Sequence, residues 1–142
     1  MLRNPLVLAL ASVLIACNGV ASATAAEITE ETIETYYAAW SNHDVDAVMA
    51  YFTDDCVYED VATGDLATGE KEIRAFAKKF LDGTPDVKVT PASITIGGAR
   101  AAVEWIMSAG SGDEAWSVRG VAILVLRDGR ISRATDYWDV EE

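Results

Sequence analysis

Residues 51–60 read YFTDDCVYED, and this stretch decides the fold because the spacing of its apolar residues changes from helical to strand-like. From Cys56 to Val61 the pattern has a period of two. Such a period places alternate side chains on opposite faces of a strand. We therefore predict a strand that carries Cys56, Tyr58 and Asp60 on one face, with Asp60 as the residue of chemical interest.

Three helices are predicted around this strand. The first begins after Thr29, an N-cap residue, and has an apolar face at helical spacing formed by Ile33, Tyr36, Tyr37 and Trp40. Asp44 can cap a second, short helix, whose buried side is formed by Val48, Tyr51 and Phe52. The third helix follows Thr68 and ends at Asp82-Gly83.

The last third of the chain predicts long antiparallel strands at residues 87–96, 100–109, 114–126 and 131–140, separated by glycine-marked turns. Helices followed by such strands pack as two layers. We expect an α+β fold in which three N-terminal helices cover one face of a curved antiparallel sheet. A strongly curved sheet makes this a cone, a cystatin-like roll, with an apolar cavity between the layers.

Residues 1–26 have the layout of a secretory signal peptide, with one early arginine, an apolar run and small residues at the end. Residues 27–142 then form a single domain that is exported and is either periplasmic or secreted. Two A-x-A patterns, at 21–23 and 23–25, suit release as a soluble protein. Residues 14–17 (LIAC) also resemble a lipobox, in which Cys17 would carry a lipid anchor; this is the only membrane association we expect.

The composition excludes several classes of partner and cofactor. A formal net charge of −12 opposes nucleic-acid binding, which needs Lys and Arg to neutralise phosphates. One histidine and scattered acids do not form a metal site, and no phosphate-binding glycine loop occurs. We expect no cofactor, and we expect Cys56 to be a small buried apolar residue without a disulfide partner.

The motifs at residues 36–40 (YYAAW), 51–60, 69–73 (GEKEI) and 128–131 (DGRI) together resemble the SnoaL-like, ketosteroid-isomerase-like branch of the nuclear transport factor 2-like superfamily. The resemblance extends over nearly all of residues 27–142. It implies a pocket domain and a homodimer that pairs across the sheet. The superfamily includes isomerases, cyclases, epoxide hydrolases, dehydratases and binding domains without catalytic activity, so it indicates the fold more sharply than the reaction.

Two families within this resemblance assign roles to particular residues. Similarity to ketosteroid isomerases implies Tyr36 as the oxyanion-binding tyrosine and Asp60 as the general base. The second aspartate of that family falls near Ala122 in this sequence.

Residues 135–139 (TDYWD) resemble instead the final strand of limonene-epoxide hydrolases, which makes Asp136 a catalytic candidate. Tyr58 and Asp60 then fall where that family has a tyrosine and an asparagine. Glu104 is the counterpart of its second acid, and the arginine expected two residues earlier is Ala102.

The residue chemistry gives a hypothesis of its own. If Asp60, Asp136 and Glu104 all face the cavity, desolvation and mutual repulsion raise at least one carboxyl pKa. Strand parity leaves open whether Glu104 lines the cavity or lies on the outer face. Arg119 offers a further alternative, in which Arg119 or Arg133 neutralises Asp136.

Hydrogen-bond donors and apolar walls complete this site. Tyr36 or Tyr58 could donate to a substrate oxygen, while Trp40 and Trp138 are candidate apolar contacts, although tryptophans also serve as core. We therefore expect an exported pocket protein that transfers a proton next to the carbonyl of a hydrophobic molecule, as an isomerase, cyclase or lyase. The alternatives are a non-catalytic carrier of a hydrophobic ligand and a dimeric interaction domain.

Overall fold

The structure is a computed structural model that describes residues 27–139 of the 142-residue chain. The predicted signal peptide, its lipidation candidate Cys17, and Val140 at the end of the last predicted strand lie outside the described residues. Within residues 27–139, no helix is long and apolar enough to cross a membrane.

The first two helices begin where their capping residues predict. Helix α1 spans Glu30–Ser41, and the Thr29 side chain accepts a hydrogen bond from the backbone N–H of Thr32. Helix α2 spans Val45–Met49, and Asp44 accepts one from the backbone N–H of Ala47 at 2.9 Å. Each cap satisfies a backbone donor that the first turn of a helix leaves free.

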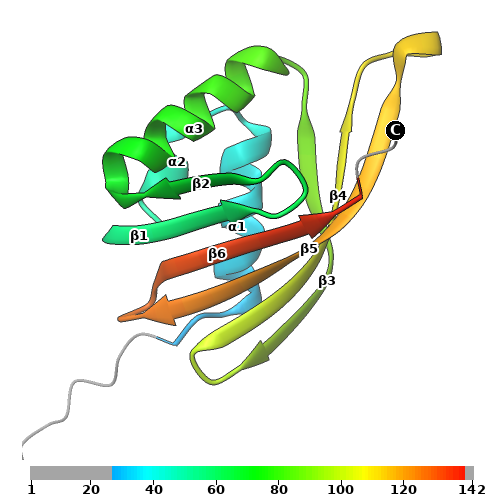
Figure 1. The fold of residues 1–142 in the computed structure, drawn as a ribbon. Coiled ribbons are helices and arrows are strands. Elements are labelled where there is room, and N and C mark those ends of the chain that lie inside the picture. The colour runs from blue at the N-terminus through cyan, green and yellow to red at the C-terminus, as the bar shows by residue number, and fades with distance from the viewer. Residues whose placement is uncertain (1–26, 140–142) are drawn as a thin grey trace, which may run out of the picture.

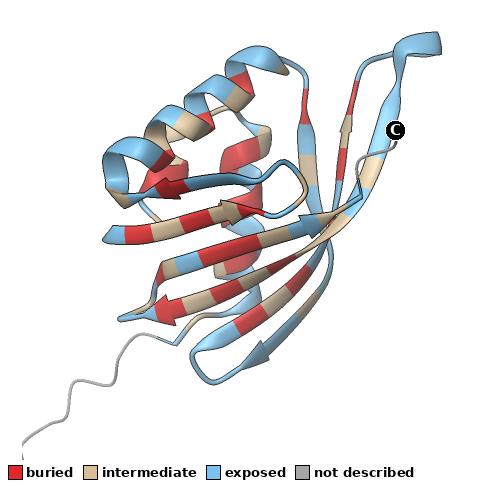
Figure 2. Cartoon of the chain, viewed as in Figure 1, coloured by how far each residue is buried: buried red, intermediate tan, exposed pale blue. Residues whose placement is uncertain are grey.

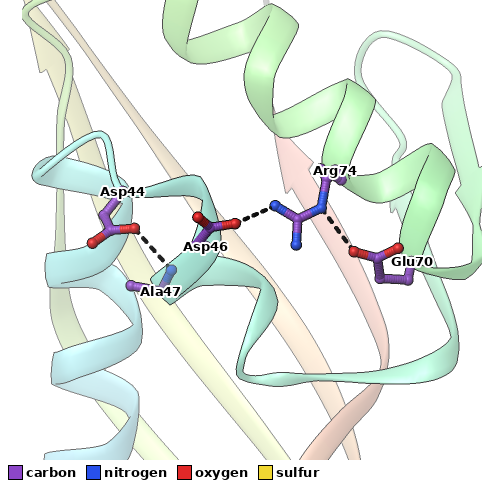
Figure 3. A network of polar contacts seen from close by, with 5 residues as sticks. All are labelled: Asp44, Asp46, Ala47, Glu70 and Arg74. Carbon is purple, nitrogen blue, oxygen red and sulfur yellow. Dashed lines mark hydrogen bonds and ion pairs between the residues drawn. The ribbon is translucent and has the colours of Figure 1, made fainter.

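An exposed polar network joins the short α2 to α3, which spans Gly69–Gly83 (Figure 3). Arg74 of α3 donates to Asp46 of α2 and, at 2.7 Å, to Glu70 one turn away. Exposed ion pairs of this kind contribute about 1 kcal/mol or less. The apolar faces of the helices therefore do more to hold them than this network does.

Six strands form one curved sheet in the order β2-β1-β6-β5-β4-β3. They are β1 (Phe52–Asp60), β2 (Asp65–Thr68), β3 (Lys88–Gly97), β4 (Arg100–Ala109), β5 (Trp116–Arg127) and β6 (Arg130–Trp138). A single turn of 3-10 helix, η1 (Gly112–Glu114), lies between β4 and β5. In Figure 1, α1 lies behind the strands and α3 runs along β1 and β2, so one face of the sheet carries the helices.

The predicted α+β class and the curved sheet are confirmed, with one difference in strand direction. All neighbouring strands are antiparallel except β1 and β6, which are parallel, so the sheet is mixed. The chain leaves β1 through β2 and α3, reaches the far edge at β3, and returns strand by strand to β6. A long connection of this kind permits parallel neighbours, whereas a tight hairpin does not.

Two boundaries also differ from the sequence expectation. Strand β1 begins at Phe52, which the helical pattern had assigned to the second helix, and not at Cys56. The register with β6 shifts between Phe52 and Val57, and this irregularity hides the alternation in the first half of the strand. Strand β2 was not predicted, because a strand of four residues is too short to show a period.

Buried residues, red in Figure 2, occur on the helices and on the strands of the sheet, and they form one hydrophobic core cluster. Ile33 of α1, Ile73 of α3 and Val103 of β4 are almost completely buried, and each contributes about 1.5–3 kcal/mol by leaving water. Cys56 is fully buried, as predicted, and burial raises the pKa of its thiol.

Gly120 in β5 makes room for a large side chain on the inner face. A Cβ atom at this position would lie 2.2 Å from the Trp105 ring, which extends across β5 from the neighbouring β4. Only a residue without a side chain tolerates this approach. The position of the Trp105 indole therefore depends on a glycine on the next strand.

We predict that Gly120→Ala lowers the free energy of unfolding by about 1–3 kcal/mol, because the added methyl group collides with a packed ring. Urea denaturation measures this loss, and tryptophan fluorescence reports the displaced indole. Gly97→Ala is the matched control, since Gly97 is also a strand glycine but a Cβ added there would meet no atom within 4 Å. Equal stability of the two variants would contradict the steric argument.

Candidate functional site

A cavity of about 420 Å³ lies between the helices and the inner face of the sheet. A volume of this size is typical of sites for small molecules. Its helical wall is aromatic, and the residues that form it are Tyr36, Tyr37 and Trp40 of α1 and Phe76 and Phe80 of α3. Tyr36 packs edge-on against Tyr37 and Trp40, which fixes these rings in one arrangement.

The sheet contributes the opposite wall, which is also aromatic. Its aromatic side chains are Tyr58 of β1, Trp105 of β4, Trp116 of β5 and Trp138 of β6. The ring centroids of Tyr58 and Phe76 are 4.7 Å apart, so β1 and α3 are in contact at the cavity. Aromatic residues from four strands and two helices thus line one cavity, which is partly open to solvent.

Asp136 lies in this wall and accepts two hydrogen bonds. The Tyr58 hydroxyl donates a short one to Oδ2, and the Trp105 indole N–H donates to Oδ1 at 3.1 Å. Burial raises the Asp136 pKa from its ordinary 3.8 to about 6, the two donors lower it in part, and the charge of Asp60 raises it. Asp136 is thus a carboxyl that changes its protonation state near neutral pH.

Asp60 ends β1 and is only 8% exposed. The Trp138 indole N–H donates to both of its oxygens, at 3.0 and 3.1 Å, and the backbone N–H groups of Ala62 and Thr63 donate to Oδ1 at 3.1 Å. Its lone pairs therefore hold the turn after β1 and orient an indole of the cavity wall. This environment differs from that of Asp136, whose two donors within residues 27–139 are both side chains.

Two of the tyrosines that line the cavity, Tyr36 and Tyr58, are candidate hydrogen-bond donors and remain protonated at physiological pH. Burial raises the pKa of Tyr36 and Tyr58 well above the ordinary 10, and the nearby Asp136 charge raises both further. Both hydroxyls can therefore donate hydrogen bonds. Tyr58 directs its proton to Asp136, while Tyr36 lies in the same lining.

The structure brings together six of the eight residues singled out from the sequence as catalytic or substrate-binding candidates. These are Tyr36, Trp40, Tyr58, Asp60, Asp136 and Trp138, all of which line the cavity.

The other two, Glu104 and Arg119, do not line it. Their side chains are 54% and 77% exposed, and they face each other at 3.8 Å on the outer face of the sheet. Trp105 next to Glu104 points inward, so strand alternation turns Glu104 outward. Strand parity left both faces open for Glu104, and the structure puts it on the outer face. The alternative in which Arg119 neutralises Asp136 is corrected.

The proposed pairing of Asp136 with Arg133 is also corrected. Arg133 is on the outer face, where it contacts Glu59 and the Thr135 hydroxyl. Sequence reasoning missed the donor to Asp136 from Trp105. The pattern placed Trp105 on the face opposite Glu104 without deciding which face was the inner one. The reach of the Trp105 indole to β6 depends on the space above Gly120. Among the described residues, no three His, Cys, Asp or Glu side chains are placed to hold a metal ion.

Asp136 should make the stability of the protein depend on pH. Its folded pKa of about 6 exceeds the ordinary 3.8, so between these values the folded chain binds more protons than the unfolded chain. Its contribution to stability is thus fully present below pH 3.8 and is lost as the pH rises through about 6, with a change of about 3 kcal/mol.

Chemical denaturation of the wild type and of Asp136→Asn between pH 4 and pH 8 measures this contribution. The wild-type free energy of unfolding, minus that of the variant, should fall across the interval by the amount given above. Subtracting the variant's free energy of unfolding cancels the contributions of the other carboxyls, which both proteins contain. The same pH dependence in both proteins would contradict the raised pKa.

Comparison with known proteins places this arrangement in a family. The SnoaL-like domain family matches residues 33–134. No curated protein matches the chain. A protein of ketosteroid isomerase-like fold from Catenulispora acidiphila, solved in complex with trimethylamine, is similar over 80% of this chain and 88% of its own, with 24% identity and a TM-score of 0.70.

Two further solved structures are similar at the same level. An LEH-like epoxide hydrolase of M. tuberculosis has 27% identity and a TM-score of 0.63, covering 75% of this chain and 79% of its own. A candidate polyketide cyclase of Sinorhizobium meliloti has 23% identity and a TM-score of 0.64, covering 77% and 95%. The chain has an enzyme-type pocket for a small molecule. It belongs to the SnoaL-like domain family of the nuclear transport factor 2-like superfamily.

Proposed function

We propose that the protein catalyses a proton transfer, without a cofactor, next to the carbonyl of a hydrophobic small molecule. The reaction would be an isomerisation, a cyclisation or an elimination. The observation that carries the proposal is a carboxyl with a pKa of about 6 in the wall of an aromatic cavity, within hydrogen-bond reach of a tyrosine. A catalytic acid or base works best when its pKa lies near the operating pH.

Asp136 is the general base in this proposal. Above pH 6 its carboxylate takes the proton from the carbon beside the carbonyl, and the electron pair moves onto the carbonyl oxygen. The same carboxyl then returns the proton to a different carbon in an isomerisation, or to a leaving group in an elimination. In a cyclisation the enolate carbon attacks a second carbonyl carbon of the same molecule, and the carboxyl gives the proton to the oxygen of that carbonyl. Tyr36, whose hydroxyl stays protonated, is the donor proposed for the oxygen that becomes negative.

In this proposal Asp60 has a supporting role, in place of the role of base that the ketosteroid isomerase resemblance implies. Three N–H donors, those of Trp138, Ala62 and Thr63, hold this carboxylate, and taking up a proton would weaken the bonds that it accepts from them. Its charge raises the pKa of Asp136, and its contact with Trp138 positions one wall of the cavity. In this proposal Asp60 therefore tunes the pKa of Asp136 and positions the Trp138 side chain.

The protein should accelerate deuterium exchange at the α-carbon of 2-tetralone, a bicyclic aromatic ketone that fits the cavity, in D2O followed by NMR. Asp136→Asn should lower the accelerated rate by at least about 10²-fold while leaving binding intact, because it removes the base. Glu104→Gln is the control, since this carboxyl lies outside the cavity. An unchanged rate in Asp136→Asn would refute the assignment of the base.

A non-catalytic carrier is the second candidate function. It is favoured by the two donors, Tyr58 and Trp105, that already occupy the oxygens of Asp136. Binding of 2-tetralone by the wild type without any exchange above the buffer rate would favour this carrier over the enzyme.

Export and self-association are further proposals. We propose export by way of residues 1–26, with either a free or a Cys17-lipidated product. We also propose a homodimer across the outer face of the sheet, which none of the described helices covers and which exposes Ile106 and Tyr137 by 39% and 50%. Val121 lies directly opposite Tyr137 on this face.

Sedimentation of residues 27–142 should give the mass of two chains. Tyr137→Lys should shift it to one chain, because a charge at the centre of an apolar contact is costly to desolvate. Ile96→Lys is the control, since this side chain is 37% exposed but lies opposite Ala101, which has the inward parity of Trp105, and so is not on the outer face. A wild-type chain that sediments as a monomer would disprove the dimer.

A further inference from the structure

The cavity contains negative charge that no basic residue of the described chain neutralises. Asp60 and Asp136 lie in its wall, and none of the ion pairs between described residues includes either of them. Within residues 27–139 the only basic side chain in the lining is Lys79, which is exposed on α3, and Asp65 also lines the cavity. The interior is therefore electrostatically suited to a cation.

The contacts of the two carboxyls satisfy hydrogen bonding without cancelling charge. Every side-chain donor from the described residues is neutral: Tyr58 and Trp105 for Asp136, and Trp138 for Asp60. Buried charge is costly unless an opposite charge compensates it. The raised pKa of Asp136 reflects this cost. A ligand with a positive charge would supply the missing compensation.

The surroundings of the carboxyls are also suited to a cation. The indoles of Trp105 and Trp138 lie beside the two carboxyls and are held in place by their N–H groups, and Trp40 and Trp116 lie in the same lining. The face of an aromatic ring attracts a cation, most strongly for tryptophan, and the attraction increases when the cation is desolvated. Donation of an N–H to a carboxylate polarises the indole further.

We propose that the ligand of this cavity carries a substituted ammonium group, which lies against the aromatic wall near Asp60 and Asp136. The inference rests on the proposed function and refines it: the substrate is a carbonyl compound that also contains a cationic nitrogen. The net charge of −12 attracts such a molecule to the protein from solution. The cavity volume of about 420 Å³ accommodates both groups.

Binding of a cation should depend on pH through Asp136. The titratable groups that face it are Tyr36 and Tyr37 on α1 and Tyr58 and Asp60 on β1. Lys79 on α3 and Asp65 on β2 are in the same lining. The tyrosines stay neutral, since burial raises each pKa. As the pH falls through about 6, Asp136 is protonated and the attraction for a cation decreases.

The test compares choline with 3,3-dimethylbutan-1-ol, in which carbon replaces the charged nitrogen without changing the shape. NMR titration of the wild type at pH 8 should show choline binding at least about tenfold more tightly than the neutral alcohol. This preference should decrease at pH 5. It should also decrease in Asp136→Asn and remain in Glu104→Gln, whose carboxyl lies outside the cavity.

Equal binding of choline and the alcohol at pH 8 would overturn the inference, as would the absence of choline binding at millimolar concentration. Because the comparison is made within the wild type, it does not depend on the folding of a variant. NMR titration of the Asp136 carboxyl without ligand separates this result from the proposed function. A pKa near 6 with no preference for choline refutes only the proposal of a cationic ligand. A pKa near 4 refutes the proposal that Asp136 is the general base.

Discussion

The parallel pairing of β1 with β6 is the constraint on which the site depends. In this register Asp60 lies directly opposite Asp136, and Tyr58 lies opposite Ala134, two residues before the carboxyl that it contacts. A slip of one residue would turn the shifted strand's side chains to the outer face. The first and last strands of the described chain must therefore pair in the correct register before the cavity has its two carboxyls.

The polar groups of the cavity reduce stability locally and give the site its chemistry. Asp136 lies in an aromatic wall where the described residues offer it only neutral donors, so its ionisation is suppressed until about pH 6. The packing of buried apolar residues such as Ile33 and Leu124 supplies the stability that offsets this cost. Departures from an optimal core are expected where function requires them. The two carboxyls differ in their hydrogen-bond donors: within the described chain, backbone N–H groups donate to Asp60 but not to Asp136.

Strand alternation predicted part of this site correctly from sequence. It placed Tyr58 and Asp60 on one face of β1, and it put Asp136 and Trp138 on one face of β6, as the structure confirms. It left Glu104 undecided, since parity relates the residues of one strand to each other and not to the core. The outward position of Glu104 follows from Trp105, whose ring occupies the inner face above Gly120.

The sequence by itself determined the helices, most of the strands and the aromatic, acidic character of the interior. These properties are local: caps such as Thr29 and Asp44 act over three residues, and apolar periodicity acts within one element. Only the tertiary structure decided that β1 and β6 are parallel and which donors Asp136 receives. It also decided that burial raises the pKa of Asp136 to about 6. Contacts between residues 78 or 31 positions apart depend on how the whole sheet assembles, and a carboxyl pKa depends on that environment and not on its neighbours in sequence.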